Sequence, residues 1–172
     1  IIKSKVDYLI GSVHFLKNKN EMWGFDNPEF IGVYKSKDID TIWAEYFDAI
    51  KSMAKTQLFD IVGHLDLIKV FKFLPKKDIR LIAKETLKEI KKSNMVLEIN
   101  PAGLRKPIGE TYPSKQLLEL AYEMDINITF GSDAHEIDQV GFKYDEAVAL
   151  AKEIGYSKCV TFENREKQII SF

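Results

Sequence analysis

The chain of 172 residues is long enough for one domain with a substantial core, and its 45% hydrophobic and 30% charged residues are typical of a globular protein. With 25 basic against 26 acidic side chains, the net charge of −1 provides no field to attract nucleic acid or an anionic membrane. No apolar stretch approaches the roughly 18 residues of a membrane span, and the single cysteine, Cys159 in the run KCVTF, predicts a buried thiol in a cytoplasmic protein.

Five apolar runs predict β-strands along the chain. They lie at residues 6–13, 59–62, 95–99, 126–130 and 158–162, and most are rich in valine and isoleucine. Their apolar residues run on instead of alternating with polar ones, which is typical of strands that are buried on both faces of a parallel sheet.

Four stretches with apolar residues at helical spacing lie between these runs. The first begins at Ile39 and the second at Ile79. The third covers residues 117–121 with Ser114 as a predicted N-cap, and the fourth covers residues 147–154 with Gly155 as a predicted C-cap. This alternation predicts an α/β fold with a parallel sheet and right-handed crossovers. About five strands are too few to close a full barrel, which takes about 250 residues.

All three histidines stand at or near the end of a predicted strand. His14 lies in GSVHF, His64 in VGHLDL, and His135 follows Asp133 in FGSDAH. Because the carboxyl ends of parallel strands meet at one edge of a sheet, we expect these residues to converge there.

Imidazoles with a carboxylate are suitable ligands for zinc, iron or manganese, and catalytic metal sites keep a position open for water. A lone histidine is more often a hydrogen-bonded core or surface residue. The repeated placement of His14, His64, Asp133 and His135 at strand ends favours metal binding for the set. Asp133 and His135, two residues apart, need not share one ion.

The stretch NPAGLRKP follows the strand at residues 95–99 and adds a candidate anion site. Gly103 would let the backbone approach a ligand, and the planar fork of Arg105 suits the oxygens of a phosphate. Beside a metal site, this combination predicts hydrolysis of a phosphate ester. Glu98 and Asn100 either orient metal ligands or are buried with ordinary hydrogen bonds, and Asp66 could simply cap a turn.

Residues 17–38 form a long, aromatic-rich excursion directly after His14. Such a segment beside a site is either a lid or substrate wall, or a packed connection anchored by Trp23 and Phe25.

The motifs GSVHFL, VGHLDL, LEINPAGLRKP and FGSDAH, in this order, resemble the later motifs of the polymerase-and-histidinol-phosphatase (PHP) superfamily, and within it the histidinol-phosphatases. The resemblance covers nearly the whole chain. It implies part of a distorted (β/α)7 TIM-like barrel, two or three divalent metal ions, and hydrolysis of L-histidinol phosphate. It also implies that His14 and His64 ligate one metal, Asp133 a second and His135 a third, with Asp133 and His135 catalytic. Arg105 would bind the substrate phosphate.

The family opens with a His-x-His motif and further ligands on early strands, and this sequence contains no such motif. We therefore expect residues 1–172 to be the C-terminal portion of a single PHP domain. The alternatives are a PHP phosphoesterase acting on another small phosphate or a nucleotide, and a non-catalytic PHP-like module that binds a partner. The expected partner is a small phosphate ester, and neither nucleic acid nor a membrane; the sequence does not indicate an oligomeric state.

Overall fold

A computed structural model describes residues 5–19 and 21–172. Residues 1–4, at the start of the predicted domain, and residue 20, inside the aromatic-rich segment, lie outside the described part. Among the described residues, four strands form a parallel sheet: β1 (Ile10–Gly11), β4 (Ile61–Val62), β5 (Val96–Ile99) and β6 (Ile128–Phe130), in the order β1-β4-β5-β6. Ile10 pairs with Ile61, Ile61 with Val96, and Leu97 with Ile128. The predicted α/β class is confirmed.

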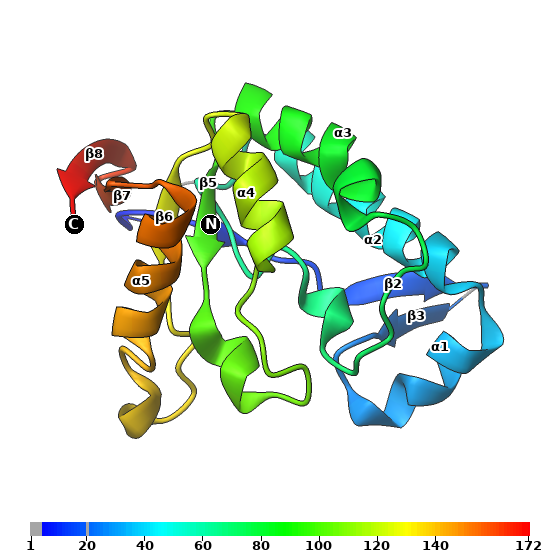
Figure 1. The fold of residues 1–172 in the computed structure, drawn as a ribbon. Helices are drawn as coiled ribbons and strands as arrows, with labels where there is room; N and C mark the ends of the chain where they lie inside the picture. Colours follow the sequence, from blue (N-terminus) through cyan, green and yellow to red (C-terminus); the bar gives the residue numbers. More distant parts are fainter. Residues whose placement is uncertain (1–4, 20) are drawn as a thin grey trace.

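The helices follow one another around the sheet as the crossovers require (Figure 1). They are α2 (Ile39–Lys55), α3 (Ile79–Lys92), α4 (Lys115–Glu123) and α5 (Tyr144–Ile154). Successive helices pack against each other, α2 on α3, α3 on α4, and α4 on α5. Short 3-10 turns lie at Pro28–Phe30 (η1), Leu67–Lys69 (η2), Pro101–Arg105 (η3) and Ile137–Gln139 (η4).

Helix ends are set by local capping. The side chains of Asp38 and Asp78 accept hydrogen bonds from the first-turn amides of α2 and α3. Ser114 occupies the predicted N-cap of α4, but its side chain makes no capping hydrogen bond. Gly155 ends α5 with φ of +121°, a conformation that favours glycine, as predicted.

Residues 17–38 are a packed connection. They contribute the hairpin of β2 (Phe15–Asn18) and β3 (Glu21–Gly24), the turn η1 and the short helix α1 (Ile31–Ser36). Trp23 and Phe25 are buried in the main hydrophobic core, and the buried Tyr34 hydroxyl donates hydrogen bonds to the carbonyls of Phe25 and Ile68. Of the two interpretations of this segment, the structure favours the anchored connection.

The prediction of a fifth parallel strand at residues 158–162 is wrong in its pairing. These residues form β7 (Lys158–Glu163), which pairs antiparallel with β8 (Glu166–Ser171). Asn164 and Arg165 both have left-handed backbone angles, φ of +51° and +69°, and form a two-residue turn that folds the chain back on itself. β7 still packs beside β6, and Cys159 is buried in the core as predicted.

The strands are shorter than the apolar runs that predicted them, since β1 and β4 have two residues each. The core consists of the apolar stripes of the helices packed on the sheet, with Trp43, Phe47, Leu87 and Leu117 among its members. Within the described part of the chain, no helix is long and apolar enough to cross a membrane.

Candidate metal centre at the carboxyl ends of the strands

His14 and His64 lie together at the carboxyl edge of the parallel sheet. His64 comes two residues after β4, and His14 three residues after β1, the neighbouring strand. Their ring centroids are 4.9 Å apart and the rings meet edge to face, with an interplanar angle of 78°. The predicted approach of these two side chains, 50 positions apart in the sequence, is confirmed.

A carboxylate that the sequence did not indicate holds the His14 ring. Asp26 Oδ2 lies 2.8 Å from Nδ1 of His14. This hydrogen bond raises the pKa of His14, although partial burial opposes it. Burial alone would raise the pKa of Asp26, but its hydrogen bond and its attraction to His14 outweigh burial, so the pKa of Asp26 is lowered.

The hairpin β2–β3 explains how Asp26 reaches this position. Phe15 pairs with Gly24 at the open end of the hairpin, so the chain returns to the start of β2 just before Asp26. A carboxylate bonded to one ring nitrogen fixes the tautomer and orientation of the imidazole, and leaves the other nitrogen as the ligand atom.

His64 is a buried imidazole with a free nitrogen. The residue is 6% exposed, and Nδ1 is buried with no hydrogen-bond partner among the described residues. Burial, and then repulsion from His14, lower the pKa of His64 to about 4, so the ring is neutral at neutral pH. A neutral imidazole with an unpartnered nitrogen is the form that binds a metal ion.

Arg105, at the end of η3, contacts the loop after β6 that carries Asp133. The Arg105 guanidinium donates to the carbonyl of Ser132 through both terminal nitrogens, each at 3.1 Å, and to the carbonyl of Asp133 at 2.5 Å. It also stacks 5.2 Å from the ring centroid of Phe142. Arg105 therefore holds the Asp133 loop in this structure.

The same loop brings the remaining predicted residue close to Asp133. His135 is exposed, and its Nδ1 lies 2.8 Å from the carbonyl oxygen of Asp133. The charge of Asp133 contributes to raising the pKa of His14, and it opposes the lowering of the pKa of His64. Asp133 itself adopts a left-handed backbone conformation, with φ of +48°.

Glycine is required at position 103 because other parts of the protein lie close to its Cα atom. A Cβ atom at this position would lie 2.0 Å from the carbonyl oxygen of Glu110 and 3.0 Å from the Tyr112 ring. The absence of a side chain lets the segment after η3 fold back, where Asn100 and Tyr112 exchange backbone hydrogen bonds. The structure therefore gives Gly103 a packing role, and its role in ligand approach stays a prediction.

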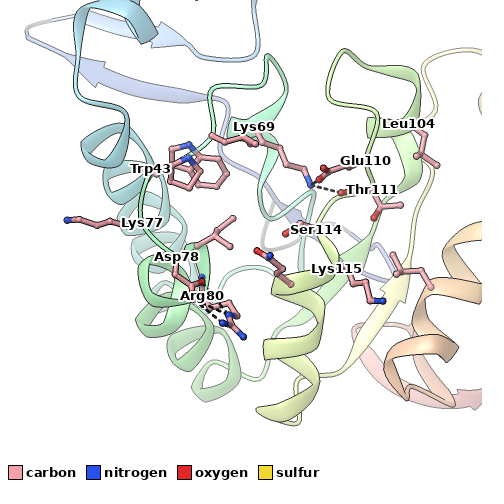
Figure 2. Close-up of a pocket in the computed structure, with 15 residues that line it drawn as sticks. Trp43, Lys69, Lys77, Asp78, Arg80, Leu104, Glu110, Thr111, Ser114 and Lys115 are labelled. Atoms are coloured by element: carbon pink, nitrogen blue, oxygen red, sulfur yellow. Dashed lines mark hydrogen bonds and ion pairs between the residues drawn. The ribbon is translucent and has the colours of Figure 1, made fainter.

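Asp66 belongs to a buried ion pair, which goes beyond the turn cap that the sequence allowed. Its Oδ2 lies 3.1 Å from Lys69 Nζ and accepts the backbone N–H of Ser114 at 2.8 Å. Lys69 Nζ also reaches Glu110 Oε2 at 3.1 Å and the Thr111 carbonyl at 2.8 Å, as Figure 2 shows.

Lys69 lines a cavity of about 650 Å³ between the amino ends of α3 and α4 (Figure 2). Its charged groups are largely paired with one another, Lys69 with Glu110 and Arg80 with Asp78. His14, His64, Arg105, Asp133 and His135 do not line it. We therefore assign the candidate site to the strand ends and not to this cavity.

The donors at the strand ends fit a divalent metal in type, and His64 also fits in protonation state because its pKa is lowered. The two rings lie side by side. The His14 ring is held by Asp26, and the His64 ring has a buried nitrogen with no hydrogen-bond partner among the described residues. Across residues 5–19 and 21–172, however, no three histidine, cysteine, aspartate or glutamate side chains are grouped closely enough to hold a metal ion. The histidine pair alone would therefore need further ligands to hold an ion.

Comparison with known proteins extends the likeness beyond the motifs. Residues 2–102 match the model of the PHP domain. A Deinococcus radiodurans protein named "Probable histidinol-phosphatase" is 39% identical over 94% of this chain and 60% of its own length. The histidinol-phosphatase of Bacillus subtilis is 30% identical over 81% of this chain and 57% of its own length.

A crystal structure of histidinol phosphate phosphatase from Lactococcus lactis, complexed with zinc, L-histidinol and phosphate, shares the fold with a TM-score of 0.69. It is 21% identical, and the match covers 96% of this chain and 63% of that one. This chain thus spans about 60% of the length of the curated relatives it matches. The family match over residues 2–102, together with the shared fold, shows that the chain belongs to the PHP domain family.

Proposed function

We propose that the protein hydrolyses L-histidinol phosphate to L-histidinol and phosphate with the help of divalent metal ions. The observation that carries the proposal is the pairing of His14 with His64 at the carboxyl edge of the sheet, with an unpartnered buried nitrogen on His64. The relatives named histidinol-phosphatase and the ligands of the Lactococcus lactis structure support the substrate.

In this proposal, His14 and His64 ligate one ion, Asp133 a second and His135 a third, so that two or three ions of zinc, iron or manganese are bound. When bound, such ions lower the pKa of a water molecule toward neutrality and stabilise the charge that develops on phosphorus. In the same proposal, Asp133 and His135 are the catalytic side chains, as the resemblance to the PHP family implies.

The chain's own residues prepare the site. Asp26 fixes the His14 ring through Nδ1, which directs the other nitrogen to the site. Burial keeps His64 neutral, so no proton has to leave before it binds a cation. Arg105 holds the Asp133 loop through two carbonyls and offers its remaining N–H groups to the phosphate oxygens.

We further propose that residues 1–172 are the C-terminal portion of a single PHP domain. Their match to only about 60% of the relatives' length supports this. The remaining ligands then come from the rest of the domain, and the whole protein, acting in the cytoplasm on a small phosphate ester, is the unit that catalyses the reaction.

Phosphate release by the purified full-length protein tests the proposal. L-histidinol phosphate should be hydrolysed in the presence of zinc, iron or manganese, and chelation should abolish the activity. Other small phosphate monoesters and nucleotides, at equal concentration, measure the preference. Faster hydrolysis of one of these, or no release from histidinol phosphate with metal bound, would contradict the assignment.

A further inference from the structure

Glu98 is a buried carboxylate that lies between the ends of the two neighbouring strands, with room made for it after β6. It lies in β5 and is 6% exposed. A Cβ atom on Gly131, after β6, would lie 1.9 Å from its Oε1, and one on Gly63, after β4, would lie 3.5 Å from its Oε2. Glycine at position 131 therefore makes room for the carboxylate, whereas the approach at Gly63 is an ordinary van der Waals contact.

The carboxylate is directed at the backbone of a proposed metal ligand. Oε2 of Glu98 accepts the His64 backbone N–H at 3.0 Å. The same oxygen accepts the side-chain N–H of Asn100 at 3.0 Å, and Asn100 in turn accepts the Ala102 N–H at 2.9 Å to begin η3. Asn100 thereby fixes the position of Oε2 of Glu98, the oxygen that accepts the His64 backbone N–H.

His64 needs such an anchor because its backbone is strained. Its φ is +29°, in a region that residues with a side chain rarely adopt. Such conformations persist only when surrounding contacts hold them. Here the N–H is held by Glu98, and the carbonyl accepts the Leu67 N–H at 2.9 Å.

We infer that Glu98 is a positioning residue: by accepting the His64 N–H, it holds the turn that presents the His64 ring to His14 and to the metal. This inference rests on the metal site of the proposed function. The feature that matters is the reach of the acceptor oxygen, because a backbone N–H needs an acceptor at hydrogen-bonding distance and not a net charge.

Two conservative variants of the full-length protein separate reach from charge. Glu98→Asp keeps the charge but withdraws the oxygen by about one C–C bond, roughly 1.5 Å. Glu98→Gln keeps an acceptor oxygen at the same reach without the charge. In metal-free protein, exchange of the His64 amide proton should become at least about tenfold faster in Glu98→Asp and stay near wild type in Glu98→Gln.

Zinc affinity, measured by competition with a chelator in the absence of substrate, should follow the same pattern. Glu98→Asp should weaken zinc binding by about ten- to a hundredfold, the range seen for partners of metal ligands, and Glu98→Gln should change it little. Thr129→Val is the matched control, since Thr129 pairs with Glu98 in register and lines the same cavity of about 260 Å³. It should leave both measurements at the wild-type value.

Equal zinc affinity and equal amide protection in folded Glu98→Asp and wild type would overturn the inference, as would an equal loss in Glu98→Gln. If Glu98→Asp does not fold, hydrogen exchange in the wild-type protein still tests the inference. A His64 amide proton that is not protected from exchange would rule out its hydrogen bond to Glu98. Absence of phosphatase activity with this pattern intact would contradict only the proposed function. Normal activity without the pattern would contradict only the role of Glu98.

Discussion

Replacing Lys69 by methionine should strongly destabilise the fold. The side chain is 2% exposed, and its ammonium lies 3.1 Å from Asp66 Oδ2, 3.1 Å from Glu110 Oε2 and 2.8 Å from the Thr111 carbonyl. Methionine preserves the apolar stem but leaves the fully buried Asp66 without its cation. Breaking a buried ion pair from one side costs about 3–5 kcal/mol, whereas the Glu110 contact is half-exposed and contributes little.

Urea unfolding of the purified protein, followed by circular dichroism, measures this loss. The expected change corresponds to a fall in melting temperature of roughly 6–20 °C for a domain of this size. Lys77→Met is the control, because Lys77 lines the same cavity but is exposed. It should change the free energy of unfolding by no more than about 0.5 kcal/mol.

The Lys69→Met defect should also depend on pH. Burial raises the pKa of Asp66, and the attraction of Lys69 opposes this. A carboxyl group with a raised folded-state pKa stabilises the fold below its unfolded pKa of about 3.9, and this stability is lost as pH rises through the folded pKa. Without Lys69 the folded pKa rises further, so the defect should be larger at pH 7 than near pH 5. A loss below about 1 kcal/mol at pH 7, or one that does not vary with pH, would refute this reasoning.

Three further outcomes are expected. Arg105→Ala in the full-length enzyme should lower kcat/KM for histidinol phosphate by about ten- to a hundredfold, the equivalent of a charge-assisted hydrogen bond, and Arg105→Lys should recover only part; wild-type kinetics would remove the phosphate-binding role. Asp26→Asn should lower the pKa of His14 in metal-free protein, measured by NMR titration, because the hydrogen bond that the ring donates to Asp26 raises this pKa. The stability that the raised pKa contributes is present below about pH 6.5 and is lost as pH rises through the folded pKa. An unchanged pKa of His14 would contradict the pairing with Asp26. Gly103→Ala should lower the free energy of unfolding by about 1–3 kcal/mol, because its Cβ would lie 2.0 Å from the Glu110 carbonyl oxygen. Gly32→Ala in α1, where a Cβ would meet nothing within 4 Å, should instead stabilise the protein by about 0.5–1 kcal/mol. Equal effects of the two substitutions would show that the close approach at Gly103 relaxes freely.

The helices could be predicted from the sequence because burial on one face imposes a 3.6-residue period. The helix predicted from Ile39 begins at that residue, with Asp38 as its cap. The antiparallel pairing of residues 158–162 could not be predicted in the same way. A short apolar run suits a parallel strand or a buried hairpin equally, and the turn at Asn164 and Arg165 contains no glycine to announce the reversal.

The site could be predicted where it depends on parallel strands alone. His14 and His64 follow neighbouring strands, so the shared edge brings them together whatever the loops do. Asp26 depends instead on the closure of the β2–β3 hairpin, and nothing in its local sequence pairs it with His14. The ion pair of Lys69 with Asp66 escaped prediction for a related reason, since burial of a lysine is visible only once its partners are placed.

The buried polar residues explain why the strand ends carry the chemistry. Among the described residues, those that are polar and buried are His64, Asp66, Lys69, Thr86, Glu98 and Asn100. All except Thr86 lie within or just after β4 and β5. Burying such groups is costly unless they pair, and here Lys69 pairs with Asp66 while Glu98 pairs with His64 and Asn100. The first of these two separate groups stabilises the loops, so Lys69→Met should lower stability. The second group holds the proposed metal ligand, so Glu98→Asp should lower zinc affinity.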